Sequence, residues 1–390
     1  MDDFLIKLPE FIFFGRESMN NLNKIFRKDV RKVLIITGKQ GAKISGALDE
    51  LKKILDKNSV EYEIFDEIKQ NPDTMTIDRG GEIVKKSNPD YIIAVGGGSV
   101  MDAAKGVAII NHGGGKIWDY VYDGIKKPKK ITGATPVIAI PTIAASGSEA
   151  DAGAVFTNSK TKEKIPVGSI HIIPKYAVDN PKYTFSVPPQ QTAYGVMDIF
   201  SHITESFIST RNDNSEYADE ITIGMLKVLV KALPEVLKEP DNYRWRAEIM
   251  FISTLAITGI PSAGRKGSMI MHYLEHPLSG HYDIIHGKGL AAIIIPYLKT
   301  MKEINGNRVE KFFKYLFNLD IDSGIKKLND WKKKNMLDVN LWEDGLTKQT
   351  LERLADDCIR NYSKGNRYLG GFEKFNKSII LRIYEQLIKK

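Results

Sequence analysis

Cysteine is almost absent from this chain of 390 residues, in which Cys358 is the only one. A single cysteine cannot form a disulfide within the chain, so the disulfide-stabilised secreted class is excluded and a reducing compartment is favoured. Cys358 falls in phase with the apolar residues of a helix-like run over 351–362. We therefore expect it to be a buried thiol of the core.

Long apolar runs are missing as well. No stretch approaches the ~18 consecutive apolar residues that a membrane-spanning helix needs. The acidic start MDDFLIKLPEFIFFG lacks the basic and then apolar order of a secretion signal. We expect a cytoplasmic protein without a membrane partner.

Neither sign of charge dominates strongly, since 56 basic residues stand against 48 acidic ones and leave a net charge of +8. The lysines mostly alternate with acids on the polar positions of amphipathic segments. The one dense run, KKPKK at 126–130, holds a proline and no aromatic residue that could stack on bases. We predict that this run is a solvated loop and that the protein has no nucleic-acid partner.

The two halves of the chain differ in their apolar pattern. The first half alternates short β-branched runs with amphipathic stretches, as in VLIIT (33–37), YIIAVGGGS (91–99), VIAIPT (137–142) and YAVDNP (176–181). This alternation predicts an α/β domain whose mostly parallel sheet is covered on both faces. After FSVPPQQ (185–191) helical periodicity dominates. We therefore predict an α/β domain over 1–185 and an all-helical domain over 186–390, divided near the paired prolines.

A glycine-rich loop is the strongest feature of the first half. In AVGGGSVMDAAK a strand runs into Gly96, Gly97, Gly98 and Ser99 and then directly into a helix. Glycines allow close approach of a ligand, and a helix N-terminus attracts an anion, so the loop suits a pyrophosphate. It is neither G-x-G-x-x-G nor a Walker A loop. A tight turn without a ligand is the alternative, but a second small-residue loop, PTIAASGSEA (141–150), favours a cofactor cleft.

Histidine is scarce, yet four of the seven histidines crowd one stretch, HYLEHPLSGHYDIIH. A fifth, His202, stands one helical turn after Asp198, so both side chains project from the same helix face. One carboxylate and several imidazoles suit Fe²⁺ or Zn²⁺. Spacing alone leaves open which downstream histidines bind. Glu205 is expected behind the ligands or on the solvent face, and the absence of H-E-x-x-H excludes the common zinc-protease helix.

Several motifs in a fixed order resemble those of the iron-containing (group III) alcohol dehydrogenases, in particular their NADPH-dependent butanol dehydrogenase and aldehyde reductase branch. The matching pieces span the chain: FFG, GGGSVMDAAK, ASGSEADAGAV, YTFSVPPQQTAYGVMDIFSHITE, LKEPDNYRWRAEIM and HYLEHPLSGHYDIIHGKGLAAIIIP. The resemblance implies a dinucleotide-binding α/β domain followed by an all-α metal-binding domain, as in dehydroquinate synthase.

The resemblance also assigns roles to residues. It implies that one divalent ion, Fe²⁺ first and Zn²⁺ as the alternative, is held by Asp198, His202, His272 and His286. His276 is expected near the nicotinamide ring as the residue that positions or relays the proton, and Asp102 is expected beside the same ring. His281 has no family role and is interpreted as a loop residue. The remaining cofactor contacts are expected at Gly96, Gly97, Gly98, Ser99, Asn71, Thr142, Ser146 and Lys164.

One departure bears on the nucleotide. NAD-preferring relatives carry an acidic residue where this chain has Gly38, followed by Lys39. An acid there would bind the ribose 2′-hydroxyl and repel a 2′-phosphate, so this pair favours NADP(H) over NAD(H).

The expected enzyme interconverts small primary alcohols and aldehydes, and the apolar FIFFG strand predicts pairing across a homodimer edge. The alternatives are a glycerol-type polyol dehydrogenase, a lyase of the dehydroquinate synthase type, and a nucleotide-binding sensor without turnover.

Overall fold

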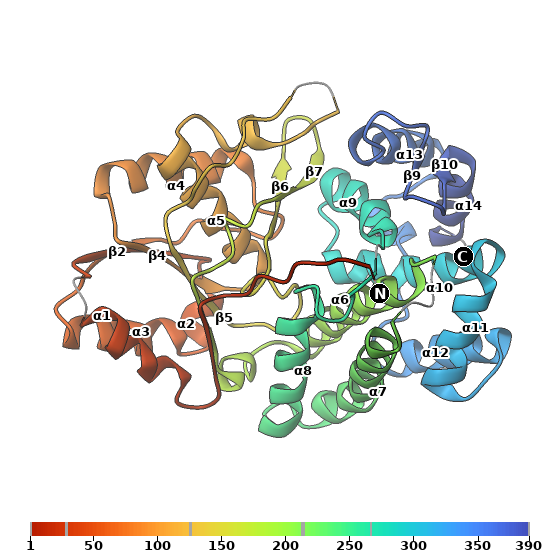
Figure 1. Cartoon of the computed structure of the whole chain (residues 1–390), viewed down its shortest axis with the longest axis horizontal. Helices are drawn as coiled ribbons and strands as arrows, with labels where there is room; N and C mark the ends of the chain where they lie inside the picture. The colour runs from red at the N-terminus through yellow and green to blue at the C-terminus, as the bar shows by residue number, and fades with distance from the viewer. Residues whose placement is uncertain (1, 28–29, 125–126, 212–214, 266, 389–390) are drawn as a thin grey trace.

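A six-stranded parallel sheet organises the first half of the molecule (Figure 1). The computed structural model describes residues 2–27, 30–124, 127–211, 215–265 and 267–388. The strand order is β1-β8-β5-β4-β2-β3, and every neighbouring pair is parallel. The strands are β1 (Phe11–Phe14), β2 (Lys32–Thr37), β3 (Glu61–Phe65), β4 (Tyr91–Gly96), β5 (Val137–Pro141) and β8 (Tyr176–Asp179).

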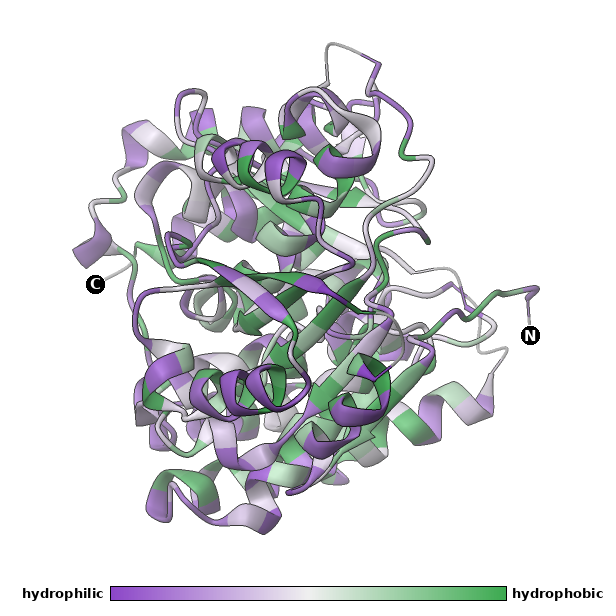
Figure 2. Ribbon diagram, turned by 90° about the vertical axis from the view of Figure 1, so that its left-hand side faces the viewer, coloured by the Kyte–Doolittle hydropathy of each residue, from purple (hydrophilic) through white to green (hydrophobic). Residues whose placement is uncertain are grey.

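Helices cover both faces of this sheet because its central strands are apolar on both sides. Leu34 and Ile36 of β2 pack with α4 and α5, whereas Val33 and Ile35 face α1 and α3. The helices of this lobe are α1 (Leu22–Phe26), α2 (Gly41–Ile44), α3 (Ala47–Lys57), α4 (Thr74–Ser87) and α5 (Gly98–Gly113). In Figure 2 the strands are largely green, and the helices around them carry purple on their outer sides.

An antiparallel hairpin, which the sequence did not predict, extends from the sheet lobe to the helical lobe. It consists of β6 (Gly153–Asn158) and β7 (Glu163–Gly168). Strand β6 packs on α5, and β7 contacts α9 (Ile270–Tyr282) of the helical lobe.

The second lobe is built almost entirely of helices around one apolar core. Its central helix, α6 (Pro189–Ile208), begins at the predicted proline pair, and Pro189 suits the first helical position. The only strands described here are the two-residue β9 (Tyr368–Leu369) and β10 (Phe375–Asn376). The other helices are α7 (Glu216–Lys238), α8 (Tyr243–Ala256), α10 (His286–Ile304), α11 (Gly306–Phe317), α12 (Ile321–Lys334), α13 (Lys348–Tyr362) and α14 (Lys377–Leu387). The expected fold class is therefore confirmed.

The N-terminal segment crosses from one lobe to the other before it enters the sheet (Figure 1). The amide of Asp2 donates to the carbonyl of Gly264 in the helical lobe at 3.0 Å. Lys7 Nζ reaches the carbonyl of Ile170, and β1 then pairs with β8 as an edge strand.

Two smaller predictions concern the core and the surface. Cys358 is fully buried, as expected, with its Sγ 2.9 Å from the hydroxyl of Tyr384. Residues 127–130 of the lysine run form an irregular segment with exposed lysines, which confirms the loop, and Lys126 lies outside the described residues. Within the described ranges, no helix combines the length and the apolar character needed to cross a bilayer.

Candidate active site

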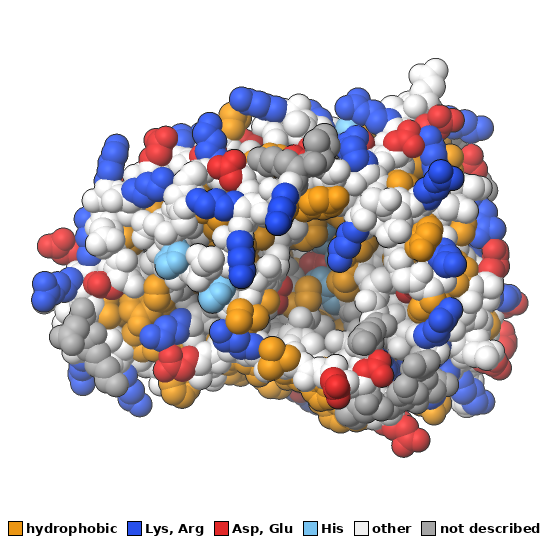
Figure 3. Space-filling view, turned by 45° about the horizontal axis from the view of Figure 1, so that its top comes forward, with side chains coloured by type: hydrophobic (Ala, Val, Ile, Leu, Met, Phe, Trp, Pro, Cys, Tyr) orange, Lys and Arg blue, Asp and Glu red, His pale blue; other side chains and the backbone are white. Residues whose placement is uncertain are grey.

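A cavity of about 470 Å³ lies between the two lobes, at the carboxyl ends of the parallel strands. Figure 3 shows the hollow from above, with histidine side chains inside it and lysine or arginine side chains along its rim. Open α/β sheets bind ligands at this edge. Of the residues expected to form the site, twelve line the cavity: Asn71, Gly97, Gly98, Ser99, Asp102, Ser146, Lys164, Asp198, His202, His272, His276 and His286. Gly38, Lys39, Gly96 and Thr142 lie outside its lining.

The glycine loop forms a close-fitting turn between β4 and α5. A Cβ at Gly97 would come within 2.6 Å of Ile143, and one at Gly98 within 2.5 Å of Ser146 Oγ. Side chains are therefore excluded where the two predicted loops meet. Gly98 and Ser99, the first two residues of α5, line the cavity, so the N-terminus of this helix offers an anion both backbone donors and the positive end of the helix.

Asp102 stands at the start of the second turn of α5, just after this loop. Its carboxylate accepts hydrogen bonds from Ser148 Oγ at 2.7 Å and from the amide of Val155 at 2.9 Å. Burial raises the pKa of Asp102 to about 6, against the lowering effect of Lys105 and the two hydrogen bonds. The carboxyl group is thus held in one orientation at the cavity wall and exchanges its proton close to neutral pH.

Asn71 and Gln70 reach across the cleft to the turn between α9 and α10. The Asn71 amide donates to Asp283 Oδ1 at 2.8 Å, and the Gln70 amide donates to the Asp283 carbonyl at 3.3 Å. Both Asn71 and Asp283 have positive φ, so each makes a sharp turn at this contact. Asn71 therefore joins the lobes as well as lining the cavity.

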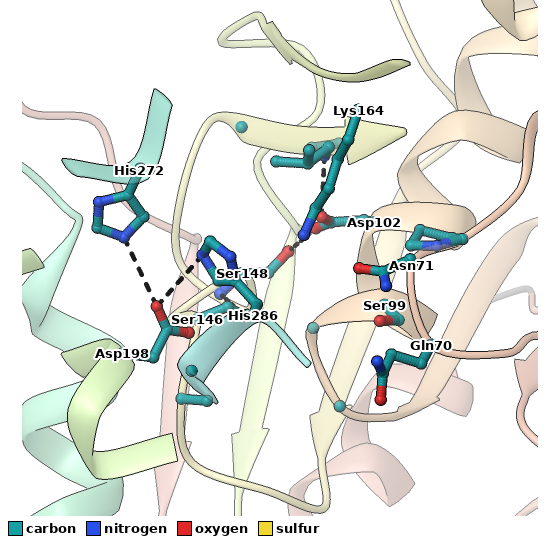
Figure 4. Close-up of a pocket in the computed structure, with 18 of the residues that line it drawn as sticks. Gln70, Asn71, Ser99, Asp102, Ser146, Ser148, Lys164, Asp198, His272 and His286 are labelled. Carbon is teal, nitrogen blue, oxygen red and sulfur yellow. Dashed lines mark hydrogen bonds and ion pairs between the residues drawn. The ribbon is translucent and has the colours of Figure 1, made fainter. Parts of the chain in front are cut away.

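Three helices bring four candidate metal ligands together, and Figure 4 shows three of them, Asp198, His272 and His286. Asp198 and His202 lie one turn apart on α6, His272 is on α9, and His286 is the first residue of α10. The Nε2 atoms of His202, His272 and His286 lie 3.7, 3.6 and 3.6 Å from Asp198 Oδ1. Ligand atoms around a tetrahedral ion with bonds of about 2.1 Å are separated by about 3.4 Å, so the three distances from Asp198 Oδ1 fit one divalent cation. Ligand atoms of Asp198, His202 and His272 also lie within 4.8 Å of one another, and His286 joins this group through its distance from Asp198.

The charge states of Asp198 and His202 fit a cation, whereas Glu205 and Asp198 outweigh burial and raise the pKa of His272 to about 9, so a cation would have to displace a proton from this ring. Asp198 Oδ1 and His272 Nε2 are buried without a hydrogen-bond partner among the described residues. Burial raises the pKa of Asp198, but His202, His286 and His272 lower it further, so the carboxylate is ionised. Burial lowers the pKa of His202 to about 3, which leaves this imidazole neutral and able to bind a metal.

Two buried glutamates lie behind the imidazoles. Glu205 accepts a hydrogen bond from His272 Nδ1, and Glu275 accepts one from His286 Nδ1. Both glutamates are fully buried, so Glu205 is not on a solvent face. Such carboxylates fix the ring orientation of metal-binding histidines and make the outer nitrogen a stronger donor. A second cluster of Glu275, His276 and His286 also has metal-ligand spacing, but its carboxylate is already engaged by His286.

His276 faces the same cavity from the next turn of α9. Its Nδ1 lies 3.1 Å from the hydroxyl of Tyr362, and that hydroxyl donates to the carbonyl of Lys164. Because the single hydroxyl proton is used there, the pattern makes Nδ1 of His276 the donor and leaves Nε2 as an acceptor. Burial, Lys164 and the neighbouring histidines lower the pKa of His276 well below its usual value, so the ring is neutral.

His281 does not lie in a loop, contrary to the expectation from sequence. It is within α9, and its Nε2 is 2.6 Å from Asp357 Oδ2 of α13. The loop interpretation rested only on the lack of a family role for His281, and it failed because α9 continues through Pro277 to Tyr282.

Sequence reasoning missed Glu275, Tyr362 and Gln70. The letters HYLEH contain Glu275, and its place beside a histidine-rich run was a usable signal. Tyr362 gave none, because its contact with His276 spans 86 residues.

Comparison with known proteins covers both lobes. The family described as iron-containing alcohol dehydrogenase matches residues 9–181. The C-terminal family of Fe-containing alcohol dehydrogenases matches residues 192–388.

Similar proteins extend over the whole length of the chain. An NADH-dependent butanol dehydrogenase B of Clostridium acetobutylicum is 33% identical over 401 residues and is covered, like this chain, to 100%. The NADPH-dependent aldehyde reductase YqhD of Escherichia coli is 28% identical, with 99% of both chains covered. The crystal structure of an NADH-dependent butanol dehydrogenase A from Thermotoga maritima has a TM-score of 0.93 at 31% identity, covering 100% of this chain and 99% of that one.

Proposed function

We propose that this chain, which belongs to the iron-containing alcohol dehydrogenase family, interconverts small aliphatic primary alcohols and aldehydes by hydride transfer with NADP(H). The observation that carries the proposal is that the candidate metal ligands around Asp198 Oδ1 and the glycine loop line the same cavity. A hydride donor and a polarised carbonyl can therefore meet there.

Asp198, His202, His272 and His286 are the residues proposed to hold the ion, with Fe²⁺ expected first and Zn²⁺ as the alternative. When bound, the ion supplies a Lewis acid for the carbonyl oxygen and the nicotinamide supplies the hydride. The protein fixes the distance and orientation of the reacting groups and keeps bulk water away, since the cluster is largely buried.

The remaining side chains bind the nucleotide and handle the proton. The amides at the start of α5 bind the pyrophosphate, and Asp102 is directed at the nicotinamide end. His276 presents Nε2 as an acceptor, which suits removal of the hydroxyl proton during alcohol oxidation. In aldehyde reduction His276 has to take up a proton before it can deliver one.

The walls beside the metal cluster favour an aliphatic substrate over a polyol. The apolar and aromatic residues that the helical lobe adds to the cavity lining are Tyr194, Ile257, Met269, Tyr273 and Ile285. A polyol would leave hydroxyl groups without partners against the side chains of Ile257, Met269 and Ile285. We therefore rank butanal-like aldehydes above glycerol.

The proposed preference for NADP(H) rests on Gly38 and Lys39. A Cβ at Gly38 would approach the carbonyl of Ile68 to 3.0 Å, and Lys39 beside it is exposed and so free to meet a 2′-phosphate. Lys39→Ala should raise the KM for NADPH about ten-fold and leave the KM for NADH nearly unchanged, because only NADPH has the 2′-phosphate. Steady-state kinetics with both nucleotides measure this difference. Equal effects on both would contradict the preference.

The function itself is tested by metal analysis coupled to activity. Stringent chelation should abolish NADPH oxidation with butanal, and Fe²⁺ or Zn²⁺ should restore it. His272→Ala should lose bound metal and turnover together while circular dichroism stays that of the wild type. Full activity of the metal-free enzyme would overturn the proposal.

We also propose that the protein is a cytoplasmic homodimer. Within each subunit we place the boundary between the two domains near residue 185. The last strand of the large sheet ends at Asp179 and α6 begins at Pro189, which supports a division into 1–185 and 186–390. Strand β1 is an edge strand with exposed Phe11 and Phe14, a surface suited to a second copy. In sedimentation equilibrium the wild type should have the mass of a dimer, and Phe11→Lys should have the mass of a monomer.

A further inference from the structure

Glu275 contacts both halves of the site. Its Oε2 accepts the hydrogen bond from His286 Nδ1, and the same oxygen lies 3.6 Å from Lys164 Nζ on β7. Its other oxygen accepts from Ser279 Oγ. Lys164 belongs to the nucleotide-binding lobe, lines the cavity, and extends in Figure 4 toward Asp102. One carboxylate therefore joins a candidate metal ligand to a residue expected at the nucleotide.

The space for Glu275 is made by the neighbouring helix. A Cβ at Gly289 of α10 would come within 2.6 Å of the Glu275 side chain. Glu275 is fully buried and Lys164 is 6% exposed, so their attraction is little screened by water. The pair is thus an internal contact, unlike a surface ion pair.

Glu205 offers a comparison within the same molecule. It too is fully buried and accepts from Nδ1 of a candidate ligand, His272. Its second oxygen accepts from the amide of Met271 in the same lobe. Among the described contacts, no lysine or arginine lies within ion-pair distance of Glu205. The two glutamates therefore differ in the link to the other lobe. They also differ in charge state, because burial raises the pKa of Glu205, whereas His286 and Lys164 outweigh burial and lower the pKa of Glu275.

We propose that Glu275 couples nucleotide binding to metal binding. The anionic groups of a bound nucleotide attract Lys164 away from Glu275. The carboxylate then interacts more strongly with the Nδ1–H of His286, and Nε2 becomes a better donor to the cation. By linkage, the nucleotide tightens metal binding and the metal tightens nucleotide binding by the same factor. This inference rests on the proposed function, since it requires both ligands to bind in this cavity.

The experiment measures the affinity of the metal-free, full-length protein for Zn²⁺ by competition with a chromophoric chelator. Each variant is titrated with Zn²⁺ in the absence of nucleotide and in the presence of a saturating amount of NADP⁺ or NAD⁺. The nucleotide used is the one that binds more tightly, as measured by quenching of tryptophan fluorescence. For the wild type we expect Zn²⁺ to bind roughly five-fold or more tightly when the nucleotide is present.

The variants separate coupling from simple support of a ligand. Glu275→Gln should weaken Zn²⁺ binding by about ten-fold or more. The ratio of its Zn²⁺ affinities with and without nucleotide should be close to one. Glu205→Gln should weaken Zn²⁺ binding by a similar factor but keep the wild-type ratio. Lys164→Met leaves the Glu275–His286 contact in place, and it should remove the coupling even if Glu275→Gln does not fold.

Two results would overturn the inference. One is a wild-type protein that binds both ligands but has the same Zn²⁺ affinity with and without nucleotide. This result would leave the proposed function intact. The other is a wild-type ratio in Lys164→Met. A wild-type protein that binds no Zn²⁺ or no nucleotide would overturn the proposed function as well.

Discussion

The three imidazoles around Asp198 differ in what lies behind them. His272 and His286 are backed by buried glutamates, whereas Nδ1 of His202 is buried without a partner among the described residues. The orientation of His202 is therefore set by α6 and by its ring stacking on His272, with centroids 4.4 Å apart. The candidate ligands are thus fixed by different means, two by hydrogen bonds and one by packing.

At the residue scale, the hydroxyl of Tyr362 is expected to control His276. Tyr362→Phe keeps the ring, which stacks on Tyr273 at 4.7 Å, but removes the acceptor of the Nδ1–H hydrogen bond. His276 is then free to rotate or change tautomer. We expect kcat for alcohol oxidation to fall by about ten-fold, with the KM for the nucleotide unchanged. Steady-state kinetics across pH measure both constants.

A matched control is Tyr384→Phe. The Tyr384 hydroxyl is equally buried and donates to the carbonyl of Leu274, but it does not line the cavity. This variant should lose about 1 kcal/mol of stability and retain wild-type kcat. If both variants lost activity equally, Tyr362 would have only a structural role.

Residue-scale prediction from sequence worked where partners are close along the chain. Asp198 and His202 share a helix face, and their i, i+4 spacing alone brought them together. Glu205 was left between two placements because burial of a helix face depends on the elements packed against it. Tyr362 and the Lys164–Glu275 contact depend on tertiary packing between lobes, which local patterns do not encode.

At the element scale, the strand–loop–helix unit around Gly98 was predictable because each part has a local signature. The β-branched run, the glycines and the helical periodicity all lie within residues 91–113. The β6–β7 hairpin was not predicted, although its strands are as long as β2 and β4, since Pro166 argues against a strand in the second half of the hairpin. Its position is stabilised by contacts with α5 and α9, which are distant in sequence.

Gly98→Ala is expected to distort the glycine loop between β4 and α5. The added Cβ would lie 2.5 Å from Ser146 Oγ and 3.0 Å from Ser146 Cβ, so the second loop has to move away. We expect nucleotide affinity to fall by at least about ten-fold, which corresponds to about 1.4 kcal/mol. Titration of tryptophan fluorescence with the nucleotide measures this loss.

The control for this change is Gly224→Ala in α7. No atom lies within 4 Å of the added Cβ, and the site is exposed in the helix interior. Alanine should therefore raise the free energy of unfolding by up to about 1 kcal/mol and leave nucleotide binding unchanged. Unchanged nucleotide binding in Gly98→Ala would contradict the close fit of the loop.

At the scale of the whole molecule, buried carboxyl groups lie where the sheet meets the helical lobe. Asp179 ends β8, and its Oδ2 accepts from Thr254 Oγ1 of α8 at 2.9 Å. Burial raises the pKa of Glu149 to about 7, and burial together with Glu149 raises that of Asp179 well above its usual value. The junction is therefore most stable when these groups keep their protons.

Stability should consequently depend on pH through Glu149. Its pKa is about 7 in the folded protein and near 4.5 in the unfolded chain, so the folded state binds the extra proton between these values. The free energy of unfolding must fall as pH rises through this window. Glu149→Gln should be more stabilising at pH 8 than at pH 5, by roughly 2 kcal/mol.

Urea denaturation of the wild type and of Glu149→Gln, each at pH 5 and pH 8, measures this change in the free energy of unfolding. Glu149→Ala serves as a second variant, which loses the charge but also leaves a cavity at both pH values. A pH-independent gain in Glu149→Gln would show that Glu149 does not titrate in this window.

The place of β1 in the sheet has a consequence for synthesis on the ribosome. Strand β1 begins at Phe11, but its partner β8 begins at Tyr176, 165 residues later, and Asp2 contacts Gly264. At roughly 5–20 residues per second, the first strand waits about 8–33 s for its partner. During that interval Phe4, Phe11 and Phe14 belong to an unpaired nascent segment, so this protein exposes its first strand to chaperones before its sheet can close.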